Sequence, residues 1–489
     1  MLRPWKTILH INLDCEKAVF QQIADGITEE IRKGRLQPGM PLPGSRVLAD
    51  DLGVNRKTVV LAYEELLAEG WLQSAYKRGT FVSEKLPVAT GSRKRQGERN
   101  RTAPERFGFM MHRSGMVSSR IAEKSVITFN DGLPDVKLAP LDELSRAYKR
   151  IFQQKARCQL LGYGNERGEE RLRAAVSTML THDRGLHVKM DSICITRGSQ
   201  MALYLTAHTL VRPGDVVAIE SPGYLPAFEA FTYAGARMHP VKVNEQGICV
   251  VELEKLCRRK KVKAVYVTPH HQFPTTVSMK ADRRMELIAL SNKYGFAIVE
   301  DDYDHDYHFG LRNLLPLASY ADAANVIYIS SLSKLIAPAV RIGYVTGPKD
   351  FIDSLSALRM IIDRQGDTVM EHAVAELMEE GIIHKHARKA LGVYRERREH
   401  MAVSLDKYAH RIATYRKPEG GLAYWITFNQ YINTEELAVK LLKKGVQVTA
   451  PDKFFFDNMP VSALRLGFAS LDNHALEEGV KIIAANVKF

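Results

Sequence analysis

The stretch Tyr328-Ile-Ser-Ser-Leu-Ser-Lys-Leu-Ile-Ala-Pro-Ala-Val-Arg-Ile-Gly-Tyr344 carries the strongest signal in the chain. It opens in an apolar run, residues 326–329, that predicts a short buried strand. Hydroxyl side chains and one lysine, Lys334, follow the strand. Pro338 argues against a single unbroken helix after Lys334, because proline lacks the backbone N–H that a helix interior needs. We therefore expect a turn that lets Lys334 and Arg341 face one pocket.

The polar residues of this stretch suit a phosphorylated aldehyde cofactor. Lys334 supplies the amine for a Schiff base. Ser331 and Ser333 supply hydroxyls, and Arg341 supplies a guanidinium, for the phosphate. A lone lysine after a strand is more often an exposed loop residue, and only these neighbours favour the cofactor. The pattern S-x-S-K-x-x-x-P-x-x-R-x-G-Y resembles the pyridoxal phosphate lysine motif of fold-type I aminotransferases.

Length and composition limit the class of protein. The 489 residues, 45% of them hydrophobic, are too many for one ordinary domain and can form more than one core. The five cysteines show no C-x-x-C spacing, which favours reduced thiols in a cytoplasmic protein over disulfides or a zinc site. We expect no metal. Because no apolar run approaches the ~18 residues needed to cross a bilayer, and the N-terminus lacks a signal-peptide core, we expect no membrane partner either.

The positive charge is unevenly distributed along the chain. The formal net charge of +13 indicates an anionic partner. Residues 1–83 carry about +1 and residues 84–124 about +6. Residues 84–123 combine these charges with helix-breaking residues, which predicts a basic linker. Residues Arg93, Lys94 and Arg95 could contact DNA phosphates, or the segment could be only a solvated spacer.

The first eighty residues predict a small domain of the helix-turn-helix type. Helices are expected over residues 19–33, 45–52 and 56–69, and short wing strands over 71–73 and 80–82. Asn55 is expected to cap the third helix. Two short helices joined by a turn that contains Gly53 form the helix-turn-helix shape.

A long motif in this region matches a known family. Residues 31–66 follow the pattern I-x-x-G-x-L-x-P-G-x-x-L-P-x-x-R-x-L-A-x-x-L-G-V-x-R-x-T-V-x-x-A-Y-x-x-L, which resembles the GntR-type winged helix-turn-helix. The resemblance implies that DNA is contacted by Arg46, Asn55, Arg56, Lys57 and Thr58, with Lys77, Arg78 and Gly79 at the wing tip. Gly44 and Lys77 depart from the family, which usually has serine and glycine at these positions.

Residues 124–489 alternate predicted strands and helices, which indicates an α/β domain with a mainly parallel sheet. Three apolar runs, 264–268, 296–300 and 326–330, recur at about one strand plus one crossover. Each run ends in polar residues or proline. Ligands of open parallel sheets bind beyond the carboxyl ends of the strands, so these polar residues mark the expected site.

The second of these runs continues into Val-Glu-Asp-Asp-Tyr-Asp, which contributes carboxylates to the site. A protonated pyridine nitrogen needs a buried carboxylate, which makes the cofactor an electron sink. The aminotransferase resemblance assigns Asp301 to that nitrogen and Tyr303 to the ring hydroxyl. We expect Asp302, Asp304 and Asp306 at the surface.

The phosphate is expected at a strand–turn–helix junction, residues 192–203. Amide groups at a helix N-terminus favour a phosphate, which makes Gly198, Ser199 and Gln200 the candidates. The resemblance places Tyr224 against the pyridine face, with plain core packing as the alternative.

Three further motifs of the resemblance concern a second subunit, the ring hydroxyl and the ligand. Tyr163 stands where the family's tyrosine reaches the phosphate of the partner subunit, which implies a homodimer. His271, Gln272 or neither contacts the ring hydroxyl, because this segment departs from the family's asparagine-proline-threonine-glycine form. Arg465 stands where the family binds the substrate carboxylate, for which guanidinium geometry is suited.

A GntR-type reader followed by an aminotransferase-like domain resembles the MocR subfamily of bacterial regulators. The resemblance implies a pyridoxal-phosphate-dependent transcriptional regulator that binds a double-stranded DNA operator and senses an amino compound or the cofactor itself. The alternative is an active aminotransferase that carries a DNA-binding domain. A third interpretation, a cofactor-free scaffold for dimerisation, is disfavoured by the presence of Lys334, Asp301 and Arg341 together.

Overall fold

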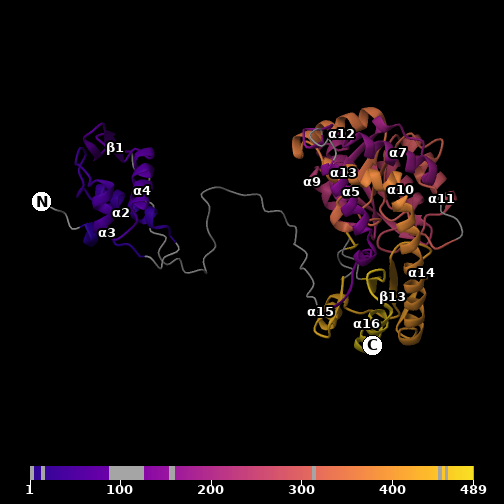
Figure 1. Cartoon of the computed structure of the whole chain (residues 1–489). Helices are drawn as coiled ribbons and strands as arrows, with labels where there is room; N and C mark the ends of the chain where they lie inside the picture. Colours follow the sequence, from indigo (N-terminus) through magenta and orange to yellow (C-terminus); the bar gives the residue numbers. More distant parts are fainter. Residues whose placement is uncertain are drawn as a thin grey trace. The chain divides into compact units, whose positions relative to one another are not determined.

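The computed structural model describes residues 5–12, 17–87, 126–153, 160–310, 315–449, 454–456 and 461–487. The chain divides into two compact units, Met1–Met116 and Val117–Phe489 (Figure 1). Most of the predicted linker over 84–123, with Arg93, Lys94 and Arg95, lies outside the described residues, as do Cys15 and Cys158. Within the described ranges, no helix is long and apolar enough to cross a membrane.

The N-terminal unit is a helical domain with a two-stranded wing. Its elements are α1 (Trp5–Ile8), α2 (Val19–Arg32), α3 (Ser45–Leu52), α4 (Arg56–Ala68), β1 (Leu72–Ala75) and β2 (Gly79–Val82). The predicted helices and wing strands are confirmed to within a few residues. Apolar side chains spaced four apart on α2, such as Ile23 and Ile27, pack against Leu48, Val59 and Leu66 in a buried core.

Local sequence signals fix the geometry of the helix-turn-helix and the wing. Gly53 ends α3 in the left-handed region at φ +66°. The Oδ1 atom of Asn55 accepts a hydrogen bond from the Lys57 N–H at 2.8 Å and so caps α4. At the wing tip, Lys77 also adopts a left-handed φ of +57°. This is the position where GntR-type wings usually have glycine, so the turn is retained at some cost in backbone strain.

The large unit is built on an eight-stranded mixed sheet with strand order β4-β11-β10-β9-β8-β5-β6-β7. Its strands are β4 (Ile193–Thr196), β5 (Val216–Ser221), β6 (Arg237–Asn244), β7 (Gly247–Ile248), β8 (Val262–Val267), β9 (Ala297–Asp302), β10 (Val326–Ser331) and β11 (Gly343–Thr346). β6, β5, β8, β9 and β10 are mutually parallel, whereas β11 is antiparallel to both neighbours and β7 is antiparallel to β6. The expected α/β architecture with a mainly parallel sheet is confirmed.

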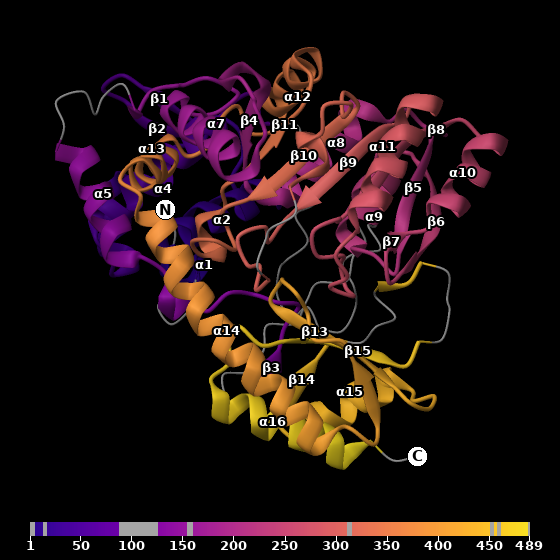
Figure 2. The same cartoon turned by 90° about the vertical axis from the view of Figure 1, so that its right-hand side faces the viewer.

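Helices cover both faces of this sheet (Figure 2), and successive strand residues enter different cores. One face carries α8 (Gly198–Leu210), α9 (Leu225–Tyr233) and α12 (Lys349–Ile362), and the other carries α7 (Glu170–Arg184), α10 (Val250–Arg259), α11 (Ala281–Tyr294) and α13 (Thr368–Glu379). Ile327 and Ile329 of β10 join the first core, whereas Val326 and Tyr328 join cores on the second face. The same alternation decides which way the polar residues at the strand ends point.

A smaller C-terminal lobe follows the long helix α14 (Ile382–Tyr408), which is prominent in Figure 2. Its elements are β12 (Ala413–Tyr415), β13 (Ala423–Phe428), α15 (Thr434–Leu442), β14 (Val446–Val448), β15 (Ala463–Gly467) and α16 (Asn473–Asn486). β3 (Ile127–Phe129) pairs in parallel with β14. The Gly467 N–H then donates to the Asn130 carbonyl at 2.9 Å, so residues 130–133 lie beside the end of β15.

Candidate functional site

Most of the predicted cofactor residues line one cavity at the carboxyl ends of the parallel strands. The cavity has a volume of about 250 Å³. It is lined by Asp131, Leu133, Ser199, Tyr224, Thr268, Phe273, Asp301, Tyr303, Ser331, Ser333, Lys334, Pro338 and Arg341. Eight of these 13 residues are predicted cofactor residues. Gln200, also predicted, is exposed and does not line the cavity.

Lys334 is half-buried beside the ring of Tyr303. Its Nζ atom lies 4.2 Å from the centroid of that ring. Burial lowers the pKa of Lys334 from 10.5 to about 8, and the nearby Asp304 carboxylate opposes this shift while the Arg465 guanidinium adds to it. The side chain is therefore a neutral, nucleophilic amine at neutral pH far more often than an ordinary lysine.

The turn after Lys334 brings Arg341 into the same cavity. A 3-10 turn spans Pro338–Val340, and Arg341 adopts a left-handed φ of +52°, so the predicted break at Pro338 is confirmed. The Arg341 guanidinium donates to the Arg197 carbonyl at 2.9 Å. It also packs on Gly198, where a Cβ atom would lie 2.8 Å from Nη2. Since Gly198 has φ +75°, both conformation and space require glycine there.

Hydroxyl groups and the first turn of α8 lie next to Arg341. Ser199 is in that first turn, where backbone N–H groups have no partner within the helix. The Ser333 hydroxyl is buried and has no hydrogen-bond partner among the described residues. Ser331 donates to the Ile342 carbonyl at 3.2 Å and accepts from the Ser333 N–H at 3.1 Å. These donors, with the guanidinium, suit a phosphate.

Asp301 is a buried carboxylate with an unused acceptor. The Tyr266 hydroxyl donates to its Oδ2 at 2.8 Å, while Oδ1 is buried and has no donor in the described part of the chain. Burial raises the pKa of Asp301 to about 7, against the effect of the Tyr266 hydrogen bond. A protonated ring nitrogen would supply both a donor and a compensating charge. Tyr224 lines the same cavity and packs edge-to-face on Phe273, with the ring centroids 5.1 Å apart.

The segment after β8 presents Thr268 and Phe273 to the cavity, and neither His271 nor Gln272 lines it. The imidazole of His271 is 2.8 Å from a buried carboxylate, and the Gln272 amide donates to two backbone carbonyls at 2.8 and 2.6 Å. Nδ1 of His271 and the Gln272 amide are thus engaged elsewhere, whereas Nε2 of His271 is buried and has no hydrogen-bond partner among the described residues. The Tyr303 hydroxyl donates to the His271 carbonyl at 2.7 Å, and Lys334 contacts the ring of Tyr303. The contact of the Tyr303 hydroxyl with the ring hydroxyl of the cofactor stays a prediction.

Arg465, the predicted carboxylate ligand, is fully buried on β15. Its guanidinium carbon is 4.6 Å from the ring centroid of Phe273, which lines the cavity. Nε donates to the Asp131 carbonyl at 3.2 Å, and Nη1 donates to the Pro274 carbonyl. Nη2 is buried and finds no acceptor among the residues that the structure describes. A ligand carboxylate would satisfy this donor.

Comparison with known proteins identifies both units. The description "Aminotransferase class I and II" matches residues 124–483, and "Bacterial regulatory proteins, gntR family" matches residues 20–82. The probable rhizopine catabolism regulatory protein MocR of Rhizobium meliloti is 28% identical over 476 residues, which cover 97% of this chain and 94% of that protein. This chain belongs to the MocR subfamily of GntR-type transcriptional regulators.

Other relatives separate the regulator from the enzymes that share its large unit. The regulator TauR of Rhodobacter capsulatus is 29% identical and covers 94% of each chain. Aromatic-amino-acid aminotransferase 1 of Thermococcus litoralis is 30% identical, over 76% of this chain and 92% of the enzyme. The near full-length matches with regulators favour regulation over aminotransferase activity.

A solved structure supports the cofactor of this MocR-type regulator. The α-aminoadipate aminotransferase LysN of Thermus thermophilus, complexed with N-(5'-phosphopyridoxyl)-L-leucine, superposes with a TM-score of 0.70 at 28% identity. The match covers 74% of this chain and 92% of LysN. The cofactor of the MocR-type domain is pyridoxal phosphate. The residues present fit this cofactor. Asp301 has an unused acceptor, Ser333 has an unused hydroxyl, and the Arg341 guanidinium packs on Gly198.

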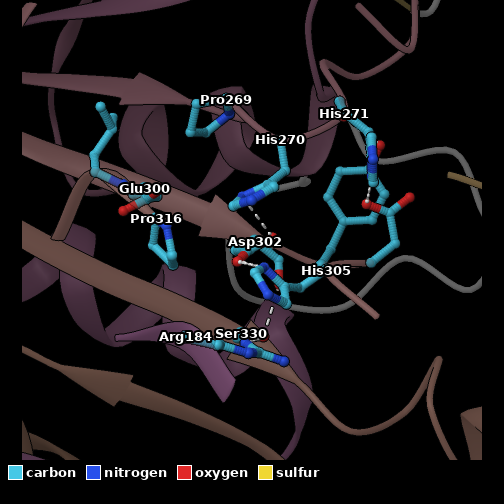
Figure 3. Close-up of polar contacts among 12 residues, drawn as sticks. Arg184, Pro269, His270, His271, Glu300, Asp302, His305, Pro316 and Ser330 are labelled. Atoms are coloured by element: carbon cyan, nitrogen blue, oxygen red, sulfur yellow. Dashed lines mark hydrogen bonds and ion pairs between the residues drawn. The ribbon is translucent and has the colours of Figure 1, made fainter. Parts of the chain in front are cut away.

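One prediction about the acidic run in this MocR-type chain is wrong. Asp302 and Asp304 are not at the surface but only 1% and 3% exposed, and Asp306 is half-buried. Asp302 lies between two imidazoles (Figure 3), with Oδ1 3.3 Å from Nδ1 of His270 and Oδ2 3.0 Å from Nδ1 of His305. His305 lies only three residues from Asp302, but His270 comes from the separate segment after β8, and no local signal in the sequence joins that segment to Asp302.

A buried arginine, Arg184, adds to the groups that favour the ionised form of Asp302. Arg184, at the end of α7, donates to the hydroxyls of Tyr328, Ser330 and Tyr344 and lies 3.2 Å from the Asp306 carboxylate. The Tyr328 hydroxyl in turn donates to Asp302 at 2.6 Å. Burial acts to raise the pKa of Asp302, but the two imidazoles and Arg184 hold it well below its usual value. Asp302 is therefore an ionised, structural carboxylate behind the cofactor cavity.

Tyr163, which is predicted to contact the phosphate bound by a second subunit, is not covered by its own chain. It is 82% exposed, and the Arg364 guanidinium lies 4.9 Å from its ring centroid. Exposed apolar side chains lie close in sequence to these two residues: Leu161 is 60% exposed and Ile361 is 82% exposed. The Thr368 hydroxyl donates to the Leu160 carbonyl at 2.6 Å and holds the two loops together. Exposed apolar groups gathered in this way are typical of an interface.

The predicted DNA-contacting residues lie at the surface of the N-terminal unit. Arg46, Asn55, Arg56, Lys57, Lys77, Arg78 and Gly79 are exposed, and Thr58 is half-buried. Arg56 and Lys57 occupy the first two positions of α4. Their charges add to those of the free N–H groups at the start of this helix, so the surface suits a negatively charged partner.

Replacing Gly198 with alanine should weaken pyridoxal phosphate binding at least about tenfold. The new Cβ would lie 2.8 Å from the Arg341 guanidinium at a residue with φ +75°. Gly214→Ala is the matched control, because Gly214 has φ +92° but nothing within 4 Å of its Cβ position. The control should lose about 1 kcal/mol of stability and keep its cofactor affinity. Absorbance titration of both variants provides the measurement, and equal affinities would contradict the prediction.

The rate at which the cofactor-free protein takes up pyridoxal phosphate should rise with pH through about 8 and then level off. The neutral amine is the nucleophile, and Lys334 loses its proton near this pH because it is buried. Stopped-flow absorbance across this pH range checks the midpoint, with Lys334→Ala as the control that should show no visible band. A midpoint near that of an exposed lysine would show that burial does not control the amine.

Proposed function

We propose that this MocR-type regulator holds pyridoxal phosphate on Lys334 and uses the surrounding cavity to detect an amino compound or the cofactor itself. One observation carries the proposal. The same cavity is lined by the half-buried Lys334 amine, whose pKa is lowered, by Asp301, whose carboxylate has an unused acceptor, and by the Arg341 guanidinium, which packs on Gly198. The same chain carries a GntR-type DNA reader. We place the reader at residues 1–83, the basic linker at 84–123 and the sensor domain at 124–489.

The bound cofactor would supply an aldehyde that condenses reversibly with primary amines. Lys334 offers the protein's own amine, and Asp301 accepts a hydrogen bond from the protonated ring nitrogen. The remaining cofactor contacts in this proposal are Gly198, Ser199, Ser331, Ser333 and Arg341 at the phosphate, and Tyr224 and Tyr303 at the ring. The side chain of Gln200 does not line the cavity, so only its backbone N–H is assigned to the phosphate in this proposal.

The effector would be recognised by its amine and its carboxylate. Arg465 orients the carboxylate through Nη2, the donor that has no acceptor within the described chain. The amine competes with Lys334 for the cofactor aldehyde. A ligand biases DNA binding only when it has different affinities for two arrangements of the protein. A tenfold change in operator affinity needs about 1.4 kcal/mol of such coupling.

The partners we propose are a double-stranded DNA operator and a second copy of this chain, within the cytoplasm. Tyr163 would reach the phosphate bound by the second copy, which agrees with its exposure and its apolar neighbours. DNA contacts would come from Arg46, Asn55, Arg56, Lys57, Thr58, Lys77, Arg78 and Gly79. A palindromic operator is the expected counterpart of a symmetric dimer.

The sensor proposal predicts that one set of amines changes both the spectrum of the bound cofactor and the affinity for DNA. The test uses the full chain loaded with cofactor and an operator selected from a pool of random duplexes. Amino acids, other amines and free cofactor are titrated against both signals. Lys334→Ala should lose the spectral response and the effect on DNA affinity together. Rapid multiple turnover with a keto acid, without any effect on DNA affinity, would favour the aminotransferase alternative.

Changing Arg56 and Lys57 together to alanine should weaken operator binding by about 1–3 kcal/mol for each base that these side chains read. The salt dependence of binding should also become shallower if these residues neutralise phosphates. The control is Lys17→Ala with Lys33→Ala, two exposed cations of the same unit outside α3 and α4. Binding measured at several salt concentrations checks both effects. Wild-type operator affinity in the Arg56 and Lys57 variant would overturn the proposed orientation of α4.

A further inference from the structure

The charged side chains of the cavity are not all accounted for by the cofactor. Asp131, Asp301, Lys334 and Arg341 line it. The ring nitrogen, the aldehyde and the phosphate pair with Asp301, Lys334 and Arg341 in the proposed function. The effector carboxylate pairs with Arg465. Asp131 is left as a carboxylate without a counterpart.

Asp131 is held in place by its neighbours. The side-chain Oδ1 of Asn130 accepts hydrogen bonds from the N–H groups of Gly132 and Leu133 at 3.0 and 2.7 Å. The carbonyl of Asp131 itself accepts from Nε of Arg465 at 3.2 Å. The backbone of Asp131 is therefore held from both sides and adjoins the predicted carboxylate ligand. A carboxylate carried on an ordered backbone is suited to selecting a ligand, because less order is lost on binding than on a mobile loop.

The carboxylate of Asp131 needs a donor that the described residues do not supply. Its Oδ1 atom is buried and has no hydrogen-bond partner among them. Its charge also extends across the cavity. It acts to raise the pKa of Lys334, against the larger effect of burial, and it adds to the burial and Asp301 effects that raise the pKa of Tyr224.

We propose that Asp131 binds a second, positively charged nitrogen of the effector, so that the effector is a diamino carboxylate. Such a ligand presents one amine to the cofactor, its carboxylate to Arg465 and its second ammonium group to Asp131. A neutral side chain would leave the carboxylate unpaired, and an acidic side chain would be repelled by it. This inference rests on the proposed amine-sensing function and specifies the class of amine.

Matched ligand pairs test the inference directly. 2,4-Diaminobutyrate differs from norvaline, and ornithine from norleucine, in having an ammonium group where the other has a methyl group. Dissociation constants come from the absorbance of the cofactor in the loaded full chain. We expect the diamino member to bind at least about tenfold more tightly in each pair, as one desolvated charge pair would allow. Asp131→Asn should remove most of this preference and leave the affinity for norvaline and norleucine within about twofold.

The control variant is Asp142→Asn, an exposed acid at the start of α5 (Leu141–Gln153), which should behave as wild type. Equal binding of the two members of each pair in the wild type would overturn the inference. An equal loss of affinity for both members of a pair in Asp131→Asn would also overturn it. That result would show that Asp131 acts on Lys334 and not on the second ammonium group of the ligand. If the loaded protein responds to no primary amine at all, the sensing proposal itself fails, and the spectrum of the loaded protein separates this result from the others.

Discussion

The alternation of side chains at the end of β9 is the constraint on which the site depends. Asp301 points to one face of the sheet, toward Tyr266 and the cofactor cavity, while Glu300 and Asp302 point to the other. A shift of one residue in the register of β9 would exchange these roles and place the wrong carboxylate in the cavity. The register is secured on the second face, where the Leu317 and Ala318 N–H groups donate to Glu300 at 2.8 and 2.9 Å. The hydrogen bonds to Glu300 on the second face of the sheet therefore help to place Asp301 in the cofactor cavity on the first face.

Three consecutive buried acids, Glu300, Asp301 and Asp302, differ in their ionisation. Asp302 is ionised because imidazoles and Arg184 surround it, whereas burial raises the pKa values of Glu300 and Asp301 to about 7. An acid with a raised pKa in the folded state stabilises the fold in its protonated form, and this contribution is lost as the pH rises through about 7. For Asp301 the protonated ring nitrogen reverses the situation, because it favours the ionised carboxylate. Cofactor binding and the stability of this strand end are thus linked.

The sequence predicted those parts of the site whose partners lie close together in the chain. Lys334, Pro338 and Arg341 lie in one strand–turn segment, and Asp301 follows a recognisable buried strand. Asp302 and Asp304 were misplaced because partners from another segment cover them: His270, beside Asp302, and His271, beside Asp304, both follow β8. Asp131 was missed for a similar reason, since the pairing of β3 with β14 brings it to the cavity. Its Asn-Asp-Gly context signals a turn, and nothing local signals a ligand site.

A contiguous set of contacts leads from the cofactor lysine to the C-terminal lobe. The Tyr307 hydroxyl donates to the Lys334 carbonyl at 2.8 Å, and the Tyr307 ring packs edge-to-face on Tyr394 of α14, with centroids 5.2 Å apart. The Tyr394 hydroxyl then accepts from the Asp135 N–H at 2.9 Å, in the segment that also carries Asp131. Contiguity becomes coupling only if these elements have two arrangements that bind the effector differently. An effector that replaces Lys334 at the cofactor and pairs with Asp131 acts on both ends of this set at once. The effector therefore interacts with groups at both ends of this set of contacts. A shift of α14 relative to the cofactor cavity would have to alter the same contacts, which is how effector binding could be coupled to such a shift.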